Sequence, residues 1–195
     1  KRNKTNIQQG DLSTATIEKA KNPLTDCDFH DKIFESGRTV IYKGFHKIDN
    51  ISVIIKVLNG DYPSAQSIEH FKREYQITRM LYLDCVVKAY DLLPFNNSLA
   101  MLLEDFDGIS LNRIMQDHSF STTEFLELAV QIISATDAIH RQNVIHKDLN
   151  PSNILWNKEA NTIKIIDFGI ATRLSKESAV LLNPGELEGT LSYIS

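Results

Sequence analysis

The stretch H-K-D-L-N-P-S-N, from His146 to Asn153, decides the fold of this chain. It follows a long segment of helical periodicity and a short apolar pair, Val144-Ile145. Taken alone, Asp148 and Asn153 beside a proline could be ordinary turn residues. Their D-x-x-x-x-N spacing also places a carboxylate and an amide on one loop, where they could orient a substrate hydroxyl and supply an oxygen ligand to a metal ion.

Three further polar signals follow the same order along the chain. Lys56 ends an apolar strand segment, and Glu74 lies in the middle of a predicted helix. D-F-G, from Asp167 to Gly169, ends the predicted strand Ile163–Ile166. Singly, a strand-end lysine or a helix glutamate is most often a solvated surface charge. The joint order and spacing favour a functional set.

Phosphoryl transfer would use each member of this set. The reaction needs positioning and charge neutralisation more than covalent work by the protein. A strand lysine can hold phosphates while a helix glutamate fixes its place, and an aspartate can orient an acceptor hydroxyl and take its proton. Mg²⁺ prefers oxygen ligands, which aspartate and asparagine supply.

These motifs resemble those of the eukaryotic-like protein kinases. V-I-I-K (Val53–Lys56) is similar to the family's V-A-I-K, H-K-D-L-N-P-S-N to its H-R-D-L-x-x-x-N, and D-F-G is identical. I-Y-K-G near the front and G-T-L-S-Y-I-S near the end also match, so the resemblance covers roughly residues 32–195. It implies an α+β, bilobal protein-kinase-like fold, with a five-stranded N-lobe and an incomplete helical C-lobe.

The resemblance also implies roles for individual residues and ATP and Mg²⁺ as cofactors. Lys56 would contact the phosphates and Glu74 would pair with it, Asp148 would be the catalytic base, and Asn153 and Asp167 would bind magnesium. His146 would be structural. The nucleotide-binding residues expected on this basis are Ser36, Gly37, Thr39, Lys56, Ile54, Glu104, Phe106 and Ser110.

The phosphate-binding loop departs from the family pattern. The three glycine positions of G-x-G-x-x-G-x-V fall on Phe34, Ser36 and Thr39, and Gly37 lies one place off. Glycines let the backbone approach phosphates closely, so either this loop is stiffer or its register differs by one residue from the family pattern. Ile54, where the family has alanine, would narrow the adenine pocket.

The catalytic loop departs at two positions. Asn150 replaces the lysine typical of serine/threonine kinases, which predicts slower chemistry. Lys147 replaces the arginine of H-R-D and lacks its bidentate fork, so activation by loop phosphorylation is in doubt.

The predicted organisation has three parts: a flexible polar extension over residues 1–29, an N-lobe over 30–104 and a partial C-lobe over 105–195. A short helix is expected around Thr14–Lys21. N-lobe strands are expected over 39–42, 51–57, 86–93 and 99–103, with a helix over 67–83. A capping box at Ser121 begins a C-lobe helix that runs to about His140. The chain stops at Ser195, where P-E should follow, which predicts a fragment of a longer protein with apolar surface left uncovered.

Bulk properties limit the partners. A net charge of -4 argues against a nucleic-acid binder that relies on positive charge. Cys27 and Cys85 form no metal or disulfide pattern, which favours a reducing, cytoplasmic setting. The apolar runs are too short to span a bilayer. E-S-G-R-T together with the catalytic loop and L-E-G-T-L-S-Y resembles the N-terminal kinase domain of large bacterial multidomain sensor (hybrid histidine) kinases. A protein substrate and further signalling domains are therefore expected.

Two other functions stay open at this point. Small-molecule kinases similar to the aminoglycoside and choline phosphotransferases use an H-x-D…N loop without the catalytic-loop lysine, and Asn150 fits them. A nucleotide-sensing pseudokinase is the second alternative, motivated by the poor glycine loop and Ile54. The preferred prediction is an ATP- and magnesium-dependent Ser/Thr protein kinase acting in signalling.

Overall fold

The first half of the chain folds into an antiparallel sheet covered by one helix. The computed structural model describes residues 23–174. The strands are β1 (Cys27–Glu35), β2 (Thr39–His46), β3 (Ile51–Leu58), β4 (Ala89–Phe95) and β5 (Ser98–Glu104). They pair in the order β1-β2-β3-β5-β4. The predicted five-stranded N-lobe of a kinase-like α+β fold is confirmed.

Strand β3 separates two layers of side chains because successive residues of a strand point to opposite faces. Val53, Ile55 and Val57 are buried in one apolar cluster on the outer face of the sheet. Lys56 and Leu58 lie on the other face, where Leu58 packs with Phe71 of helix α1 (Ala65–Met80). The strand therefore delivers Lys56 to the side of the sheet that the helix covers.

Helix α1 begins two residues before the predicted start and ends three residues before the predicted end. The Ser64 hydroxyl accepts the Ser67 N–H at 3.1 Å and so caps the first turn. At the other end the backbone of Leu81 leaves the helical region, and its side chain is buried, only 2% exposed. Packing of Leu81 in the C-lobe cluster accounts for the earlier stop.

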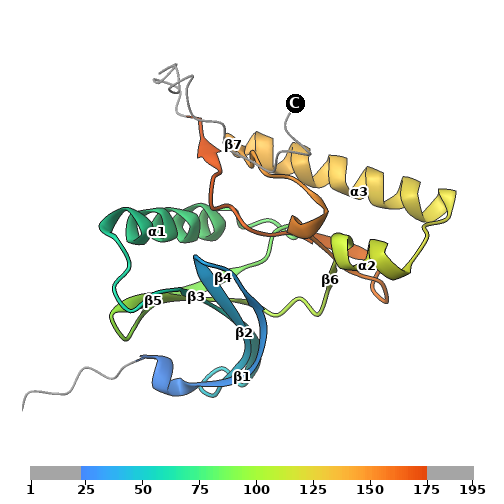
Figure 1. The fold of residues 1–195 in the computed structure, drawn as a ribbon. Helices are drawn as coiled ribbons and strands as arrows, with labels where there is room; N and C mark the ends of the chain where they lie inside the picture. The colour runs from blue at the N-terminus through green and yellow to red at the C-terminus, as the bar shows by residue number, and fades with distance from the viewer. Residues whose placement is uncertain (1–22, 175–195) are drawn as a thin grey trace, which may run out of the picture.

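The second half is helical with short strands (Figure 1). Its helices are α2 (Leu111–Asp117) and α3 (Thr122–Arg141), with a 3-10 turn, η2, at Pro151–Asn153. The strands are β6 (Ile109–Ser110), β7 (Val144–Ile145), β8 (Ile154–Asn157), β9 (Thr162–Ile165) and β10 (Thr172–Arg173). They form a β6-β8-β9 sheet and a β7-β10 pair. The capping box at Ser121 is present with both of its hydrogen bonds to Glu124.

Some boundaries differ from the sequence expectations. The proposed division at residue 30 falls inside β1, and a 3-10 turn, η1 (Pro23–Asp26), precedes that strand, because Leu24 and Cys27 are buried against the sheet. Helix α2 was not expected, since it is too short for its periodicity to show. The expected helix at 14–21 and the G-T-L-S-Y stretch lie outside the described residues.

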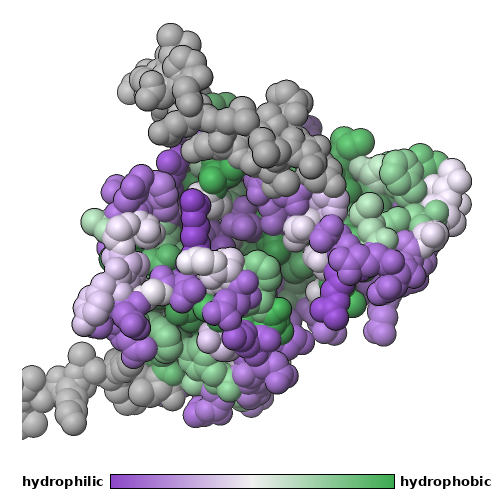
Figure 2. All heavy atoms as spheres, in the orientation of Figure 1, coloured by the Kyte–Doolittle hydropathy of each residue, from purple (hydrophilic) through white to green (hydrophobic). Residues whose placement is uncertain are grey.

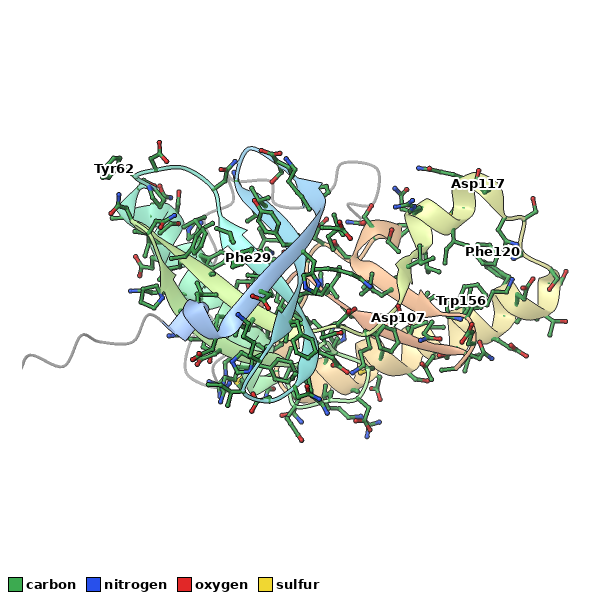
Figure 3. All side chains as sticks on the ribbon, turned by 90° about the horizontal axis from the view of Figure 1, so that it is seen from below. Phe29, Tyr62, Asp107, Asp117, Phe120 and Trp156 are labelled. Atoms are coloured by element: carbon green, nitrogen blue, oxygen red, sulfur yellow. The ribbon has the colours of Figure 1, made fainter. Side chains whose placement is uncertain are left out.

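The C-lobe core lies beneath α3. Ile139 and Val144 are almost fully buried there with Trp156, whose ring lies 5.9 Å from that of Phe120 (Figure 3). The other side of α3 is apolar and exposed, as the green area over that helix in Figure 2 shows. Its exposed large side chains are Phe125, Leu126, Val130 and Ile133. This agrees with the expectation of uncovered apolar surface.

Between residues 23 and 174 no helix combines the length and the apolar character that crossing a membrane requires.

Replacing Gly44 with alanine should destabilise the N-lobe by about 1–3 kcal/mol. A Cβ at this position would lie 2.7 Å from the Asp28 carbonyl oxygen and 2.6 Å from the Ile55 side chain. Gly37→Ala is the matched control, because a Cβ there would meet nothing within 4 Å. Chemical denaturation measures both variants, and equal unfolding free energies would contradict the close packing of β1 on β2.

Candidate active site

A buried ion pair joins the sheet to α1. The Lys56 Nζ lies 2.5 Å from Glu74 Oε1, and both side chains are 9% exposed. The same ammonium donates to Asp167 Oδ1 at 3.3 Å. Three residues far apart in the sequence, from β3, α1 and the segment after β9, are therefore brought together as predicted.

The charges of these groups depend on one another. Burial by itself would lower the pKa of the Lys56 ammonium, but the carboxylates of Glu74 and Asp167 outweigh it and raise the pKa above its ordinary value. Burial acts to raise the pKa of Asp167, but Lys56 and the Gly169 N–H lower it further than burial raises it. At neutral pH the lysine is thus cationic and Asp167 anionic.

A second contact fixes α1 relative to the D-F-G segment. Arg73, next to Glu74, donates from Nη2 to the Ala171 carbonyl oxygen at 3.1 Å. Phe168 is 1% exposed in the core cluster that also contains Ile77 of α1. The helix position, and with it the Glu74 carboxylate, depends on the segment that follows Asp167.

His146 connects the catalytic loop with the D-F-G segment, as expected of a structural residue. Its Nε2 lies 3.0 Å from the Ile166 carbonyl oxygen, and its Nδ1 accepts the Asp148 N–H at 3.3 Å. Its ring also packs on Phe168, with centroids 4.7 Å apart. An acceptor at Nδ1 and a donor at Nε2 describe a neutral imidazole, and burial correspondingly lowers the His146 pKa.

Two buried asparagines hold the Asp148 carboxylate. Asn150 donates to Oδ1 at 3.1 Å, and Asn153 donates to Oδ2 at 3.1 Å. Both amides also donate to the Asp148 carbonyl oxygen, and the Asn150 Oδ1 accepts the Ser152 N–H. These hydrogen bonds therefore fix the orientation of the Asp148 carboxylate.

The side-chain oxygens of Asn153 and Asp167 are of the kind that binds a magnesium ion. The Ile166 N–H donates to the Asn153 carbonyl at 3.0 Å, which sets Asn153 beside the residue that precedes Asp167. Because the Asn153 amide nitrogen points to Asp148, its Oδ1 is turned away and is the atom suited to a cation. Within residues 23–174 no three His, Cys, Asp or Glu side chains form a metal site by themselves. An ion held here would take its remaining ligands from phosphates and water.

A cavity of about 570 Å³ lies over this cluster. Of the predicted site residues, it is lined by Ser36, Gly37, Thr39, Lys56, Glu74, Asp148 and Asp167. Ile54, Glu104, Phe106, Ser110 and Asn153 do not line it. The structure thus gathers the phosphate end of the predicted site in one cavity, and the residues expected around adenine and ribose lie outside it.

Glu104 has a different environment from the one expected of a nucleotide contact. Its carboxylate lies 2.6 and 2.8 Å from the Lys164 Nζ and accepts the Lys88 N–H. Lys164 also lies over the Phe106 ring at 5.3 Å. The Glu104 N–H also donates to the Lys88 carbonyl at 2.9 Å, so contact of Glu104 with a nucleotide stays a prediction.

Ser110 and Ile54 take structural positions as well. Ser110 caps α2 by accepting the Arg113 N–H at 3.4 Å. Ile54 pairs with Leu103 of β5 on one side and Lys43 of β2 on the other, which places it in the sheet between these two strands. Their contact with a nucleotide stays a prediction.

The matched protein family agrees with this geometry. Residues 30–195 match the model of the protein kinase domain. The chain is 32% identical over 161 residues to the serine/threonine-protein kinase PrkC of Bacillus subtilis, with 82% of this chain and 24% of that protein covered. It is 30% identical over 167 residues to a probable serine/threonine-protein kinase PknB of Lactococcus lactis, with 84% of this chain and 26% of that protein covered. The chain spans about a quarter of the length of these relatives.

Sequence reasoning missed three supporting residues. Asn150 was noted only as a replacement, and its bond to the Asp148 carboxylate could not be inferred without the loop geometry. Lys164 and Arg73 carry no motif that would separate them from surface charges. The Ile-Lys-Ile alternation of β9 predicts a solvent-facing lysine, but all three residues are buried and Lys164 is only 8% exposed.

His146 should make stability fall below neutral pH. Its folded-state pKa lies below the ordinary 6.5, so the unfolded chain binds the proton more readily. The neutral His146 ring contributes to the free energy of unfolding above pH 6.5. This contribution is lost as the pH falls below that value, by at most about 1.4 kcal/mol per pH unit. In His146→Asn, which keeps a donor and an acceptor but does not titrate, unfolding free energy should fall less between pH 7 and 5.5. If the unfolding free energies of wild type and His146→Asn changed equally with pH, His146 would not be the neutral, buried group described here.

Proposed function

Because the chain belongs to the protein kinase domain family, we propose that it transfers the γ-phosphate of ATP to serine or threonine hydroxyls of a protein, with Mg²⁺. One observation carries the proposal. The Asp148 carboxylate, fixed by Asn150 and Asn153, lines the same cavity as Lys56 and Asp167. The residues proposed as base, phosphate-binding cation and metal-binding carboxylate therefore line one cavity, which supports the proposal.

Each residue has a defined task in this reaction. Lys56, held by Glu74, binds the α- and β-phosphates. Asp148 accepts the proton of the substrate hydroxyl while the oxygen of that hydroxyl forms a bond to the γ-phosphorus of ATP. The bond between the γ-phosphorus and the oxygen that bridges it to the β-phosphate breaks, and ADP is released. Asp167 and Asn153 would hold Mg²⁺, which neutralises phosphate charge when bound.

The acceptor is best assigned as a protein. The relatives named above are called serine/threonine-protein kinases, which supports a protein substrate over a small alcohol. Buried Asn150 does not decide between the two acceptor classes: it orients Asp148, so its presence in place of lysine does not by itself indicate a small-molecule kinase. We further propose a cytoplasmic setting, where ATP is available and the free thiols Cys27 and Cys85 stay reduced. Additional signalling domains and the sensor-kinase resemblance stay predictions.

Replacement of Asp148 by alanine should remove phosphoryl transfer. Loss of a positioned base lowers rates by roughly 100- to 10,000-fold. The measurement is transfer of labelled phosphate from ATP in the presence of Mg²⁺ to a panel of proteins and of small alcohols. Asp117→Ala is the control, because Asp117 is exposed at the end of α2, away from the five-stranded sheet (Figure 3), and does not line the cavity.

The outcomes separate the candidate functions. Label on protein that is lost in Asp148→Ala but kept in Asp117→Ala supports the proposal. Label on small alcohols alone would indicate a small-molecule kinase. Nucleotide binding without transfer to any acceptor would indicate a regulatory pseudokinase and would overturn the proposed activity.

A further inference from the structure

The loop between β1 and β2 is closed by its own hydrogen bonds. Ser36, Gly37 and Arg38 connect the two strands, and the Ser36 N–H donates to the Thr39 carbonyl at 2.8 Å. Asn59, just after β3, ties the loop down from outside. Its side-chain amide donates to the Ser36 carbonyl at 3.1 Å, and its N–H donates to the Arg38 carbonyl at 2.8 Å. The loop is thus a tight, anchored turn.

The Ser36 hydroxyl occupies the inside of this turn. Its oxygen accepts the backbone N–H of Arg38 at 3.2 Å and that of Thr39 at 3.0 Å. It donates to the Thr39 carbonyl at 3.2 Å. Successive backbone N–H groups that converge in a turn form an anion-binding concavity. Here a neutral oxygen of the chain itself already fills that position.

The same turn faces the proposed phosphate site. Ser36, Gly37, Arg38 and Thr39 line the cavity together with Lys56 and Asp167. Among the hydrogen bonds of the described residues, none uses the Gly37 N–H. The loop therefore offers one open backbone donor to an incoming phosphate, and two more are engaged by Ser36.

We propose that Ser36 is an internal competitor of the nucleotide phosphates: ATP must displace its hydroxyl from the Arg38 and Thr39 N–H groups before the loop can bind phosphate oxygens. Charged phosphate oxygens are stronger acceptors than a hydroxyl, so the exchange is feasible. Its cost makes Ser36 a residue that lowers phosphate affinity. This inference rests on the proposed function, because it assumes that the cavity takes ATP.

Binding measurements on the complete chain test the proposal without relying on catalysis. ATP, ADP and adenosine are titrated with Mg²⁺ into wild type, Ser36→Ala and Ser36→Thr, by calorimetry. Ser36→Ala should bind ATP and ADP roughly three- to tenfold more tightly, the worth of one or two freed hydrogen bonds. Adenosine affinity should be unchanged, and Ser36→Thr, which keeps the oxygen, should resemble wild type.

Other results would overturn the proposal. Unchanged or weaker ATP binding by Ser36→Ala, with normal adenosine binding, would mean that the hydroxyl organises the loop for phosphate and does not compete with it. Equal tightening of adenosine would mean that the effect does not involve the phosphates. Failure of the wild type to bind any of the three would instead refute the proposed function itself, and the Ser36 proposal with it.

Discussion

The contact between Lys56 and Glu74 is the interaction on which the rest of the site depends. Both charges are buried, and removing either partner would leave the other without compensation in a setting of low polarity. The pair therefore fixes how α1 lies on the sheet. Because Lys56 also reaches Asp167, the same contact sets the distance between the N-lobe and the D-F-G segment.

Contacts of His146 connect the D-F-G segment with the catalytic loop. Phe168 is buried against His146, and His146 holds both the Ile166 carbonyl and the Asp148 backbone. Lys147 and Asp167 adopt positive φ angles of 66° and 64°, which non-glycine residues hold only where surrounding contacts impose them. The asparagines then orient the Asp148 carboxylate. Asp148, Lys56 and Asp167, the proposed base, phosphate-binding cation and metal ligand, are thus positioned by one connected set of contacts, and the Ser36 loop lines the same cavity.

The sequence predicted the parts of the site that depend on spacing along the chain. Lys56, Asp148, Asn153 and Asp167 belong to motifs, and Glu74 follows from its spacing after Lys56 within a predicted helix. The period of α3 predicted the helix itself, but not that Phe125 and Ile133 of the same apolar period are exposed. The rest depends on contacts between distant segments. The Glu104–Lys164 pair joins residues of β5 and β9, and the hydrogen bonds of Ser36 follow from the turn geometry. Helix α2 was missed because seven residues are too few for a clear period.

The most direct test of this account is a double-mutant cycle with Lys56→Met and Glu74→Gln, measured as the free energy of unfolding. Each single variant should lose stability because it leaves one buried charge or dipole unpaired, and the double variant should lose less than the sum. We expect a coupling of about 1–3 kcal/mol. Additive losses would mean that the two side chains do not stabilise one another and would contradict the central role given to this ion pair.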